Sequence, residues 1–84
     1  MASLGIVLMG TNIELRLISL IVRAREVSDE VILLDLGSDD DTIELAIESD
    51  CKVIEYDGER NGIAIAKLLS NHELQEQTLV IRVD

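Results

Sequence analysis

The sequence predicts an α/β fold in which strands and helices alternate as βαβαβαβ around one four-stranded parallel sheet. Short apolar runs at 4–9 and 31–35 alternate with segments whose polar residues recur at helical spacing. The run at 31–35 is apolar on both faces, as in an interior strand of a parallel sheet that helices cover on each side. We therefore expect a three-layer, Rossmann-like arrangement within a single domain at 1–84.

The individual elements follow from local patterns. Strands are predicted at 4–9, 31–35, 52–56 and 78–83, and helices at 12–26, 42–49 and 63–69. The first helix carries its polar stripe on Arg16, Ser19, Arg23 and Glu26, and is otherwise apolar. We expect the second helix to turn Ile43, Ala46 and Ile47 inward. Ser38 or one of the acids after it is expected to cap that helix.

The composition of the strands predicts their order in space. The first two strands are apolar throughout and should be central, whereas Lys52 and Glu55 in the third and Arg82 in the fourth suit edges. The order 3-2-1-4 satisfies this, and right-handed crossovers then place the first two helices on one face and the third on the other. The segment 78–83 becomes an exposed apolar edge, which predicts either further chain after Asp84 or a homodimer paired through that strand.

Composition limits the classes of partner. The 84 residues carry 17 acids against 7 bases, a net charge of −10, and a single aromatic residue, Tyr56. Nucleic acid and anionic membranes both require clustered Lys and Arg, so neither is expected as a partner, and no apolar run is long enough for membrane insertion. The single cysteine, Cys51, suits a reducing compartment and is interpreted as a packing residue. We expect a cytoplasmic protein.

Asp35 is the residue that most suggests a function. It ends the apolar run at 31–34, at the edge of the sheet where open α/β folds bind ligands. A nearly buried carboxylate is costly unless something pairs with it. One interpretation is a contact with a ligand, and the other is a carboxylate that caps the turn following the strand.

The loops after the strands offer further polar groups. Gly10-Thr11-Asn12 follows the first strand, and Tyr56-Asp57-Gly58 follows the third. The first two helices could present their N-termini to phosphate, although the acids at 39–41 would oppose a second anion there. Those acids are interpreted as a solvated helix start rather than as a metal cluster. Glycine at these ends would let the backbone approach a ligand closely.

These residues carry a resemblance to the nucleotide-binding half of a family 2 glycosyltransferase, the A-type nucleotide-diphospho-sugar transferase fold. The family's second strand continues into a motif Asp-Glu-(apolar)-Val-Asp-x-Gly-Ser-x-Asp-x-Thr. The residues that match it are Asp29, Glu30, Asp35, Gly37, Ser38, Asp40 and Thr42. Its first loop, Pro-Thr-x-Asn-Glu, corresponds to 10–14, which keeps Asn12 and Glu14 and loses the proline. Lys52-Val53-Ile54 matches the third strand.

The resemblance implies roles for several residues. Asp35, in one motif with Gly37 and Ser38, would contact the base, and Thr11, Asn12 and Glu14 would flank the nucleotide. Arg60 would replace a basic residue that the family places after the glycine of Asn61-Gly62. Asp84 would supply the first aspartate of the family's Asp-x-Asp, near the ribose or a diphosphate bound to Mg²⁺ or Mn²⁺.

The implied partner is a nucleotide or a nucleotide-diphospho-sugar. The resemblance covers neither the acceptor site nor the usual catalytic base, which contributes roughly 10²–10⁴-fold to such a reaction. We therefore expect binding without sugar transfer by this chain alone. The alternative is a non-catalytic structural domain that self-associates and keeps a vestigial site.

Two other α/β classes fit less well. A dinucleotide-binding half requires G-x-G-x-x-G after the first strand, where the chain has only Gly10. A phosphorelay receiver shares Leu34-Asp35-Leu36, but it would need acids where Met9-Gly10-Thr11 stand.

Overall fold

The computed structural model describes residues 4–58, 62–70 and 77–83. Within these ranges the strands are β1 (Leu4–Gly10), β2 (Glu30–Asp35), β3 (Lys52–Glu55) and β4 (Gln77–Val83), and the helices are α1 (Glu14–Arg25), α2 (Thr42–Glu48) and α3 (Gly62–Ser70). The predicted order of elements is confirmed, and every boundary lies within two residues of the predicted one.

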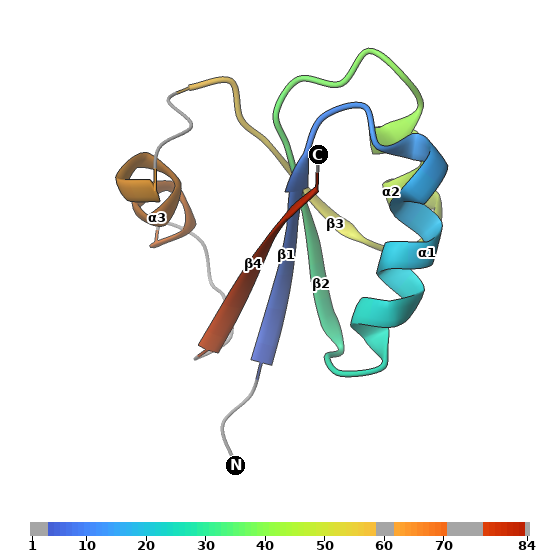
Figure 1. Ribbon diagram of the computed structural model, residues 1–84, viewed down its shortest axis with the longest axis horizontal. Helices are drawn as coiled ribbons and strands as arrows, with labels where there is room; N and C mark the ends of the chain where they lie inside the picture. The colour runs from blue at the N-terminus through green and yellow to red at the C-terminus, as the bar shows by residue number, and fades with distance from the viewer. Residues whose placement is uncertain (1–3, 59–61, 71–76, 84) are drawn as a thin grey trace.

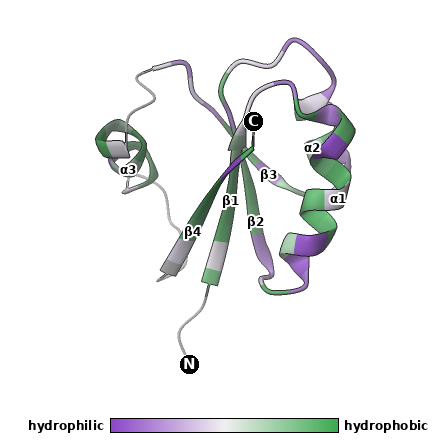
Figure 2. Cartoon of the chain, viewed as in Figure 1, coloured by the Kyte–Doolittle hydropathy of each residue, from purple (hydrophilic) through white to green (hydrophobic). Residues whose placement is uncertain are grey.

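The four strands form one sheet in the order β3-β2-β1-β4, with every neighbouring pair parallel. Figure 1 shows α1 and α2 on one side of this sheet and α3 on the other. The structure is therefore the three-layer α/β fold that the sequence predicts, with the two apolar strands β1 and β2 at its centre. Figure 2 shows the hydrophobic residues concentrated on these strands and the polar ones on the loops beyond their carboxyl ends.

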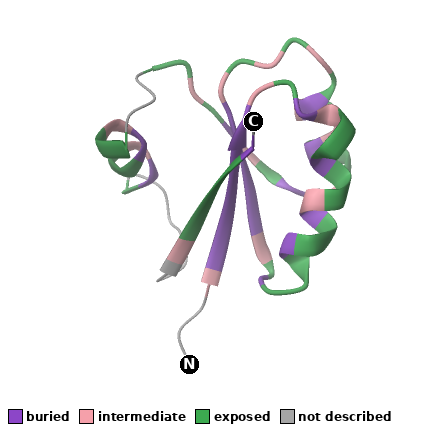
Figure 3. Ribbon diagram, viewed as in Figure 1, coloured by how far each residue is buried: buried purple, intermediate pink, exposed green. Residues whose placement is uncertain are grey.

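Each face of the sheet has its own hydrophobic cluster. The cluster under α1 and α2 is the larger one, and it contains Ile6, Leu8, Ile13, Leu17, Ile21, Ala24, Val31, Leu33, Ala46, Cys51 and Val83. The cluster under α3 contains Val7, Met9, Ile32, Leu34, Ile54, Ile65 and Leu69. Successive residues of β1 and β2 enter opposite clusters because side chains alternate across a strand. These two strands are buried along almost their whole length (Figure 3).

Helix α1 packs through a single face. Leu17, Ile21 and Ala24 are buried at spacings of four and three, which place them on one side of the helix. Leu15 lies on the opposite side and is 96% exposed. Arg23 and Arg25 lie in the last turn, where their positive charges interact favourably with the negative end of the helix dipole and stabilise this end of the helix.

Helix α2 differs from the prediction in the side chain that it buries. Thr42 and Ala46, one turn apart, are buried against the sheet, whereas Ile47 is 61% exposed. The expectation that Ile47 faces inward is therefore wrong. A helix of seven residues has room for one buried row, and here Thr42 is drawn into that row by hydrogen bonds to two loops.

Among the described residues, the face under α3 is covered more thinly than the face under α1 and α2. Helix α3 contributes only Ile65 and Leu69 to the buried set. Beyond it, Leu79, Val80 and Ile81 of β4 are exposed large hydrophobic residues on an edge strand. None of the described helices is long and apolar enough to cross a membrane.

Candidate functional site

The carboxyl ends of the four strands lie side by side. The parallel registers pair Gly10 with Asp35, Asp35 with Glu55, and Gly10 with Val83. The loops that follow β1, β2 and β3 therefore emerge at one edge of the sheet, at the top of the view in Figure 1. This is the edge at which open α/β sheets bind ligands.

Asp35 is 1% exposed, and its carboxylate is occupied by the turn that follows it. One oxygen, Oδ2, accepts hydrogen bonds from the backbone N–H of Gly37 at 3.1 Å and of Ser38 at 3.0 Å, and Oδ1 accepts one from the Ser38 hydroxyl. These three bonds account for the burial of the charge. Asp35 thus caps its own turn, and one of the roughly four acceptor positions of a carboxylate remains for a ligand.

Gly37 makes that turn possible. Its φ is +103°, a conformation that side chains strongly disfavour, and a Cβ built there would meet nothing within 4 Å. The constraint at Gly37 is therefore conformational rather than one of space.

A polar hollow of about 350 Å³ lies at this edge, between the ends of β2 and β3. Its lining residues are Asp35, Gly37, Glu55, Tyr56 and Asp57. The backbone of Tyr56 donates to the Asp35 carbonyl at 2.8 Å, and the Tyr56 ring lies so close to Gly58 that a Cβ there would come within 2.6 Å of the phenolic oxygen. Two further acidic residues, Glu55 and Asp57, therefore line the hollow together with the buried Asp35.

Asn12 ties the β1–α1 loop to the β2–α2 loop. Its backbone N–H donates to Ser38 Oγ at 2.9 Å, and its side-chain Oδ1 accepts from the Asp39 N–H at 2.8 Å. Asn12 has φ +54°, a left-handed conformation that asparagine tolerates better than most residues. Asn12, Ser38 and Asp35 thus form one hydrogen-bonded chain that joins the ends of β1 and β2.

Asp40 and Thr42 make a second link between these loops. Asp40 Oδ2 accepts from the Glu14 N–H at 3.3 Å, and its Oδ1 accepts from the Thr42 N–H at 3.0 Å and from the Thr42 hydroxyl. The Ile13 N–H donates to Thr42 Oγ1 at 3.0 Å. The hydrogen bond from the Thr42 side chain is the largest of the effects that hold the pKa of the Asp40 carboxyl below its ordinary value.

This link confirms the expected cap of the second helix. Asp41 occupies the N-cap position of α2 without a side-chain cap bond, and Asp40, one of the acids after Ser38 that were expected to cap this helix, supplies the capping carboxylate. The same carboxylate reaches the first turn of α1. An anion of the protein's own therefore occupies the position at the two helix N-termini that phosphate could have taken, in keeping with the expected opposition from the acids at 39–41.

Gly10 has a packing role in addition to the close approach to a ligand that was expected at this loop, whereas Thr11 keeps its predicted role as a candidate contact. A Cβ on Gly10 would meet the Val83 carbonyl oxygen at 2.6 Å, so glycine is required there for β1 and β4 to lie together. The Thr11 hydroxyl is buried and has no hydrogen-bond partner among the described residues. Such a group is rare in proteins, and it is a candidate for a contact with a ligand.

The structure brings most of the predicted site residues to this edge. The loops that carry Thr11, Asn12, Glu14, Asp35, Gly37 and Ser38 are joined by the hydrogen bonds above. Arg60 and Asp84 lie outside the described residues. Asp57 belongs to a loop that was singled out for its polar groups without being assigned a role. Glu55 was not predicted at all, and only the register that sets it beside Asp35 reveals it.

The described residues do not by themselves form a metal site. Across 4–58, 62–70 and 77–83, no three His, Cys, Asp or Glu side chains gather so that they could hold a metal ion. The residue predicted to bind Mg²⁺ or Mn²⁺, Asp84, is beyond this range. The buried thiol of Cys51 has a raised pKa because burial disfavours the thiolate, which fits the packing role predicted for it.

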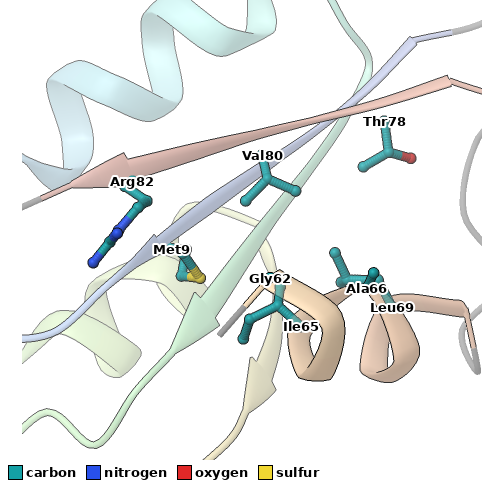
Figure 4. Close-up of a pocket in the computed structure, with 8 residues that line it drawn as sticks. All are labelled: Met9, Gly62, Ile65, Ala66, Leu69, Thr78, Val80 and Arg82. Atoms are coloured by element: carbon teal, nitrogen blue, oxygen red, sulfur yellow. The ribbon is translucent and has the colours of Figure 1, made fainter. Parts of the chain in front are cut away.

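A second hollow lies on the α3 face. This apolar groove has a volume of about 470 Å³ and runs between α3 and β4, lined by Met9, Gly62, Ile65, Ala66, Leu69, Thr78, Val80 and Arg82. Figure 4 shows Thr78 near the start of β4 and Arg82 near its arrowhead. Although the groove is larger than the polar hollow, none of the predicted site residues that the structure describes lines it.

The chain is similar to glucosyl-3-phosphoglycerate synthase from Mycobacterium tuberculosis in complex with Mn²⁺, UDP and glucosyl-3-phosphoglycerate, at 26% identity and a TM-score of 0.77 over 99% of this chain and 34% of that one. A complex of the same enzyme with Mn²⁺, UDP and phosphoglyceric acid matches with the same identity and TM-score, over 33% of its length. No protein-family model matches the sequence, and no curated protein matches it.

The fold and the grouped loops define the chain as a Rossmann-like α/β unit with a polar carboxyl edge. Within that class the structure is similar to a family 2 glycosyltransferase, so the predicted resemblance is confirmed. The chain spans about a third of the length of the enzyme it matches.

Proposed function

We propose that this chain binds a nucleotide or a nucleotide-diphospho-sugar at the carboxyl edge of its sheet, as the donor-nucleotide-binding part of a glycosyltransferase-like protein. The observation that carries the proposal is the match of almost the whole chain to an enzyme solved with UDP and Mn²⁺. On this proposal residues 1–84 form a single nucleotide-diphospho-sugar-transferase-like domain.

The polar hollow suits the base or the ribose better than the phosphates. Glu55 and Asp57 are exposed acids beside the buried Asp35, and carboxylates accept hydrogen bonds from N–H and hydroxyl groups and repel a diphosphate. The buried hydroxyl of Thr11 has no hydrogen-bond partner among the described residues. It would gain one from a ligand bound beside the β1–α1 loop. These groups support binding at this edge, with the diphosphate directed away from the three acids.

Transfer of sugar is not proposed for this chain alone. The acceptor site and the catalytic base implied by the resemblance have no counterpart among the predicted site residues. A divalent ion such as Mg²⁺ or Mn²⁺ would neutralise the diphosphate, as the Mn²⁺ and UDP found together in the relatives suggest. The described residues offer no donor set for it, so Asp84 remains the proposed ligand.

A titration of the isotope-labelled chain with UDP and GDP, each with and without Mg²⁺ or Mn²⁺, tests the proposal. We expect amide shifts at Thr11, Asp35 and Asp57 and none at Ile65 in the groove. Replacing Asp57 by Asn should weaken binding, whereas Asp50→Asn, at the turn between α2 and β3, should not. No shift at millimolar nucleotide would falsify the proposal.

The alternative function is self-association through the edge strand, favoured by the exposed Leu79, Val80 and Ile81. Measurement of mass in solution over a range of concentrations tests it. Ile81→Lys should then shift the chain to a monomer, while Ile63→Lys on the exposed side of α3 should leave the mass unchanged. A wild-type chain that is monomeric at every concentration rules out the homodimer. A cytoplasmic location remains a proposal that rests on composition.

A further inference from the structure

Two helices begin at the candidate site, and neither is capped by its own N-cap side chain. Ile13 stands at the N-cap of α1 and Asp41 at that of α2, and neither side chain makes a cap hydrogen bond. The first N–H groups of any helix need acceptors. Here Asp40 and Thr42 supply acceptors to both helices, so two separate segments of the chain share one pair of caps.

The two oxygens of Asp40 have different partners. Oδ2 bonds to the Glu14 N–H at the start of α1, and Oδ1 bonds to Thr42 at the start of α2. An amide in place of the carboxylate has one acceptor oxygen and one donor NH₂ group. Asn at position 40 can therefore keep one of the two links and must lose the other.

The link extends to the residues proposed to meet the nucleotide. The loop from Thr11 to Ile13 is held at one end by Thr42 Oγ1 and in its middle by the bonds between Asn12 and the 38–39 segment. The Ser38 hydroxyl bonds in turn to Asp35. Thr11 and Asp35 thus depend for their relative placement on hydrogen bonds that Asp40 and Thr42 help to maintain.

We propose that Asp40, acting with Thr42, is the positioning residue of the nucleotide site: it locks the β1–α1 loop to the β2–α2 loop and so sets Thr11 against Asp35. This inference rests on the proposed nucleotide binding. Asp40 acts through the loops and not by touching the ligand. Its carboxylate also occupies the anion position at both helix N-termini, which directs the ligand's phosphates elsewhere.

Four variants test this role. Asp40→Asn cuts one of the links, and Asp39→Asn removes the same charge from the adjacent exposed acid, for which no side-chain hydrogen bond is found among the described residues. Thr42→Val removes the hydroxyl at nearly constant volume, and Thr42→Ser restores it. The full chain is used throughout, at a temperature at which every variant is folded.

The first measurement is hydrogen exchange at the amides of residues 12–14. We expect faster exchange in Asp40→Asn and in Thr42→Val, and wild-type exchange in the two control variants. The second measurement is the affinity for UDP and for GDP, with Mg²⁺. We expect a loss of roughly tenfold in Asp40→Asn and Thr42→Val, the size expected when hydrogen bonding to a charged group is disturbed.

The results of these measurements distinguish the positioning role of Asp40 from the proposed nucleotide binding. Faster exchange with unchanged affinity would make the link a purely structural one and overturn the positioning role, as would unchanged exchange in Asp40→Asn. Recovery of affinity in Thr42→Ser supports the role, because it assigns the loss to the missing hydrogen bonds of the hydroxyl and not to a change in side-chain packing. If Thr42→Val does not fold, the comparison of Asp40→Asn with Asp39→Asn in exchange and in affinity tests the positioning role by itself. A wild-type chain that binds neither nucleotide overturns the proposed function itself, and the positioning role with it.

Discussion

The two faces of the sheet differ in how completely the chain covers them. Under α1 and α2 lies the larger cluster, and the loops above it bond to one another through Asn12, Asp40 and Thr42. Under α3 the cluster is smaller, a groove of about 470 Å³ stays open, and β4 exposes large apolar side chains. The difference teaches that the face under α1 and α2 holds most of the described core and lies beneath loops that bond to one another, while the α3 face exposes apolar side chains of β4 among the described residues.

The largest expected effect comes from the core of the covered face. Leu17 is fully buried in α1, and Leu17→Ala should lower the free energy of unfolding by about 2–5 kcal/mol. Ile65→Ala, beside the open groove, should cost about 2 kcal/mol or less, because water can occupy the space that is left. Urea unfolding followed by circular dichroism measures both, and Leu15→Ala on the exposed side of α1 is the control. Equal losses at Leu17 and Ile65 would contradict the difference between the faces.

A smaller effect is expected where β1 meets β4. Gly10→Ala would place a methyl group 2.6 Å from the Val83 carbonyl oxygen, so the strands must move apart, at a cost of about 1–3 kcal/mol. Gly62→Ala in α3 has no neighbour within 4 Å and should leave stability unchanged or slightly improved. Thermal unfolding of the two variants gives the comparison, and a harmless Gly10→Ala would show that β4 is held loosely.

A substitution in the turn that Asp35 caps should lower the stability of the chain by less. Gly37→Ala keeps all three hydrogen bonds to Asp35 within reach but strains a backbone with φ +103°, at about 1–2 kcal/mol. The same urea experiment measures the loss. A cost near zero would mean that the turn can change conformation, and that the hollow beside it is not rigid.

The smallest effect is expected from the pH dependence of the Asp40 link. The pKa of the Asp40 carboxyl is lowered in the folded chain. The stability that the ionised carboxylate contributes is therefore complete above the ordinary pKa of 3.8, and it is lost as the pH falls through the lower pKa of the folded chain. Wild-type stability should therefore fall more steeply below about pH 4 than that of Asp40→Asn. Glu44 acts in the opposite sense, because a hydrogen bond to Asp41 and the charge of Asp41 raise its pKa. Since Glu44 is present in both proteins, the difference between their urea midpoints isolates Asp40.

Much of the site was predictable because its residues carry local signals. Asp35 follows an apolar run, and Gly37 and Ser38 follow Asp35 at turn spacing, so their meeting at one strand end required no tertiary information. The use of the Asp35 carboxylate was one of two open interpretations, and the structure shows the turn-capping one. Whether a ligand takes the remaining acceptor position stays a prediction.

Other features depended on pairs that are distant in sequence. Glu55 became part of the hollow because β3 pairs with β2 in a register that sets it beside Asp35. Ile47 was expected inside and is exposed, whereas Thr42, which accepts a hydrogen bond from Ile13 across 29 residues, is buried on a different row with Ala46. No periodicity within α2 contains that information.

The amino-acid sequence by itself determined the order of elements, the central place of β1 and β2, and the edge at which the polar loops gather. These follow from local hydrophobic patterns and from the alternation of side chains along a strand. Only the tertiary structure decided that Asp40 caps two helices, that Gly10 is needed for β4 and that one face stays open. Each of these features depends on which groups far apart in the sequence come within hydrogen-bonding or van der Waals distance. The packing of the folded chain determines those distances.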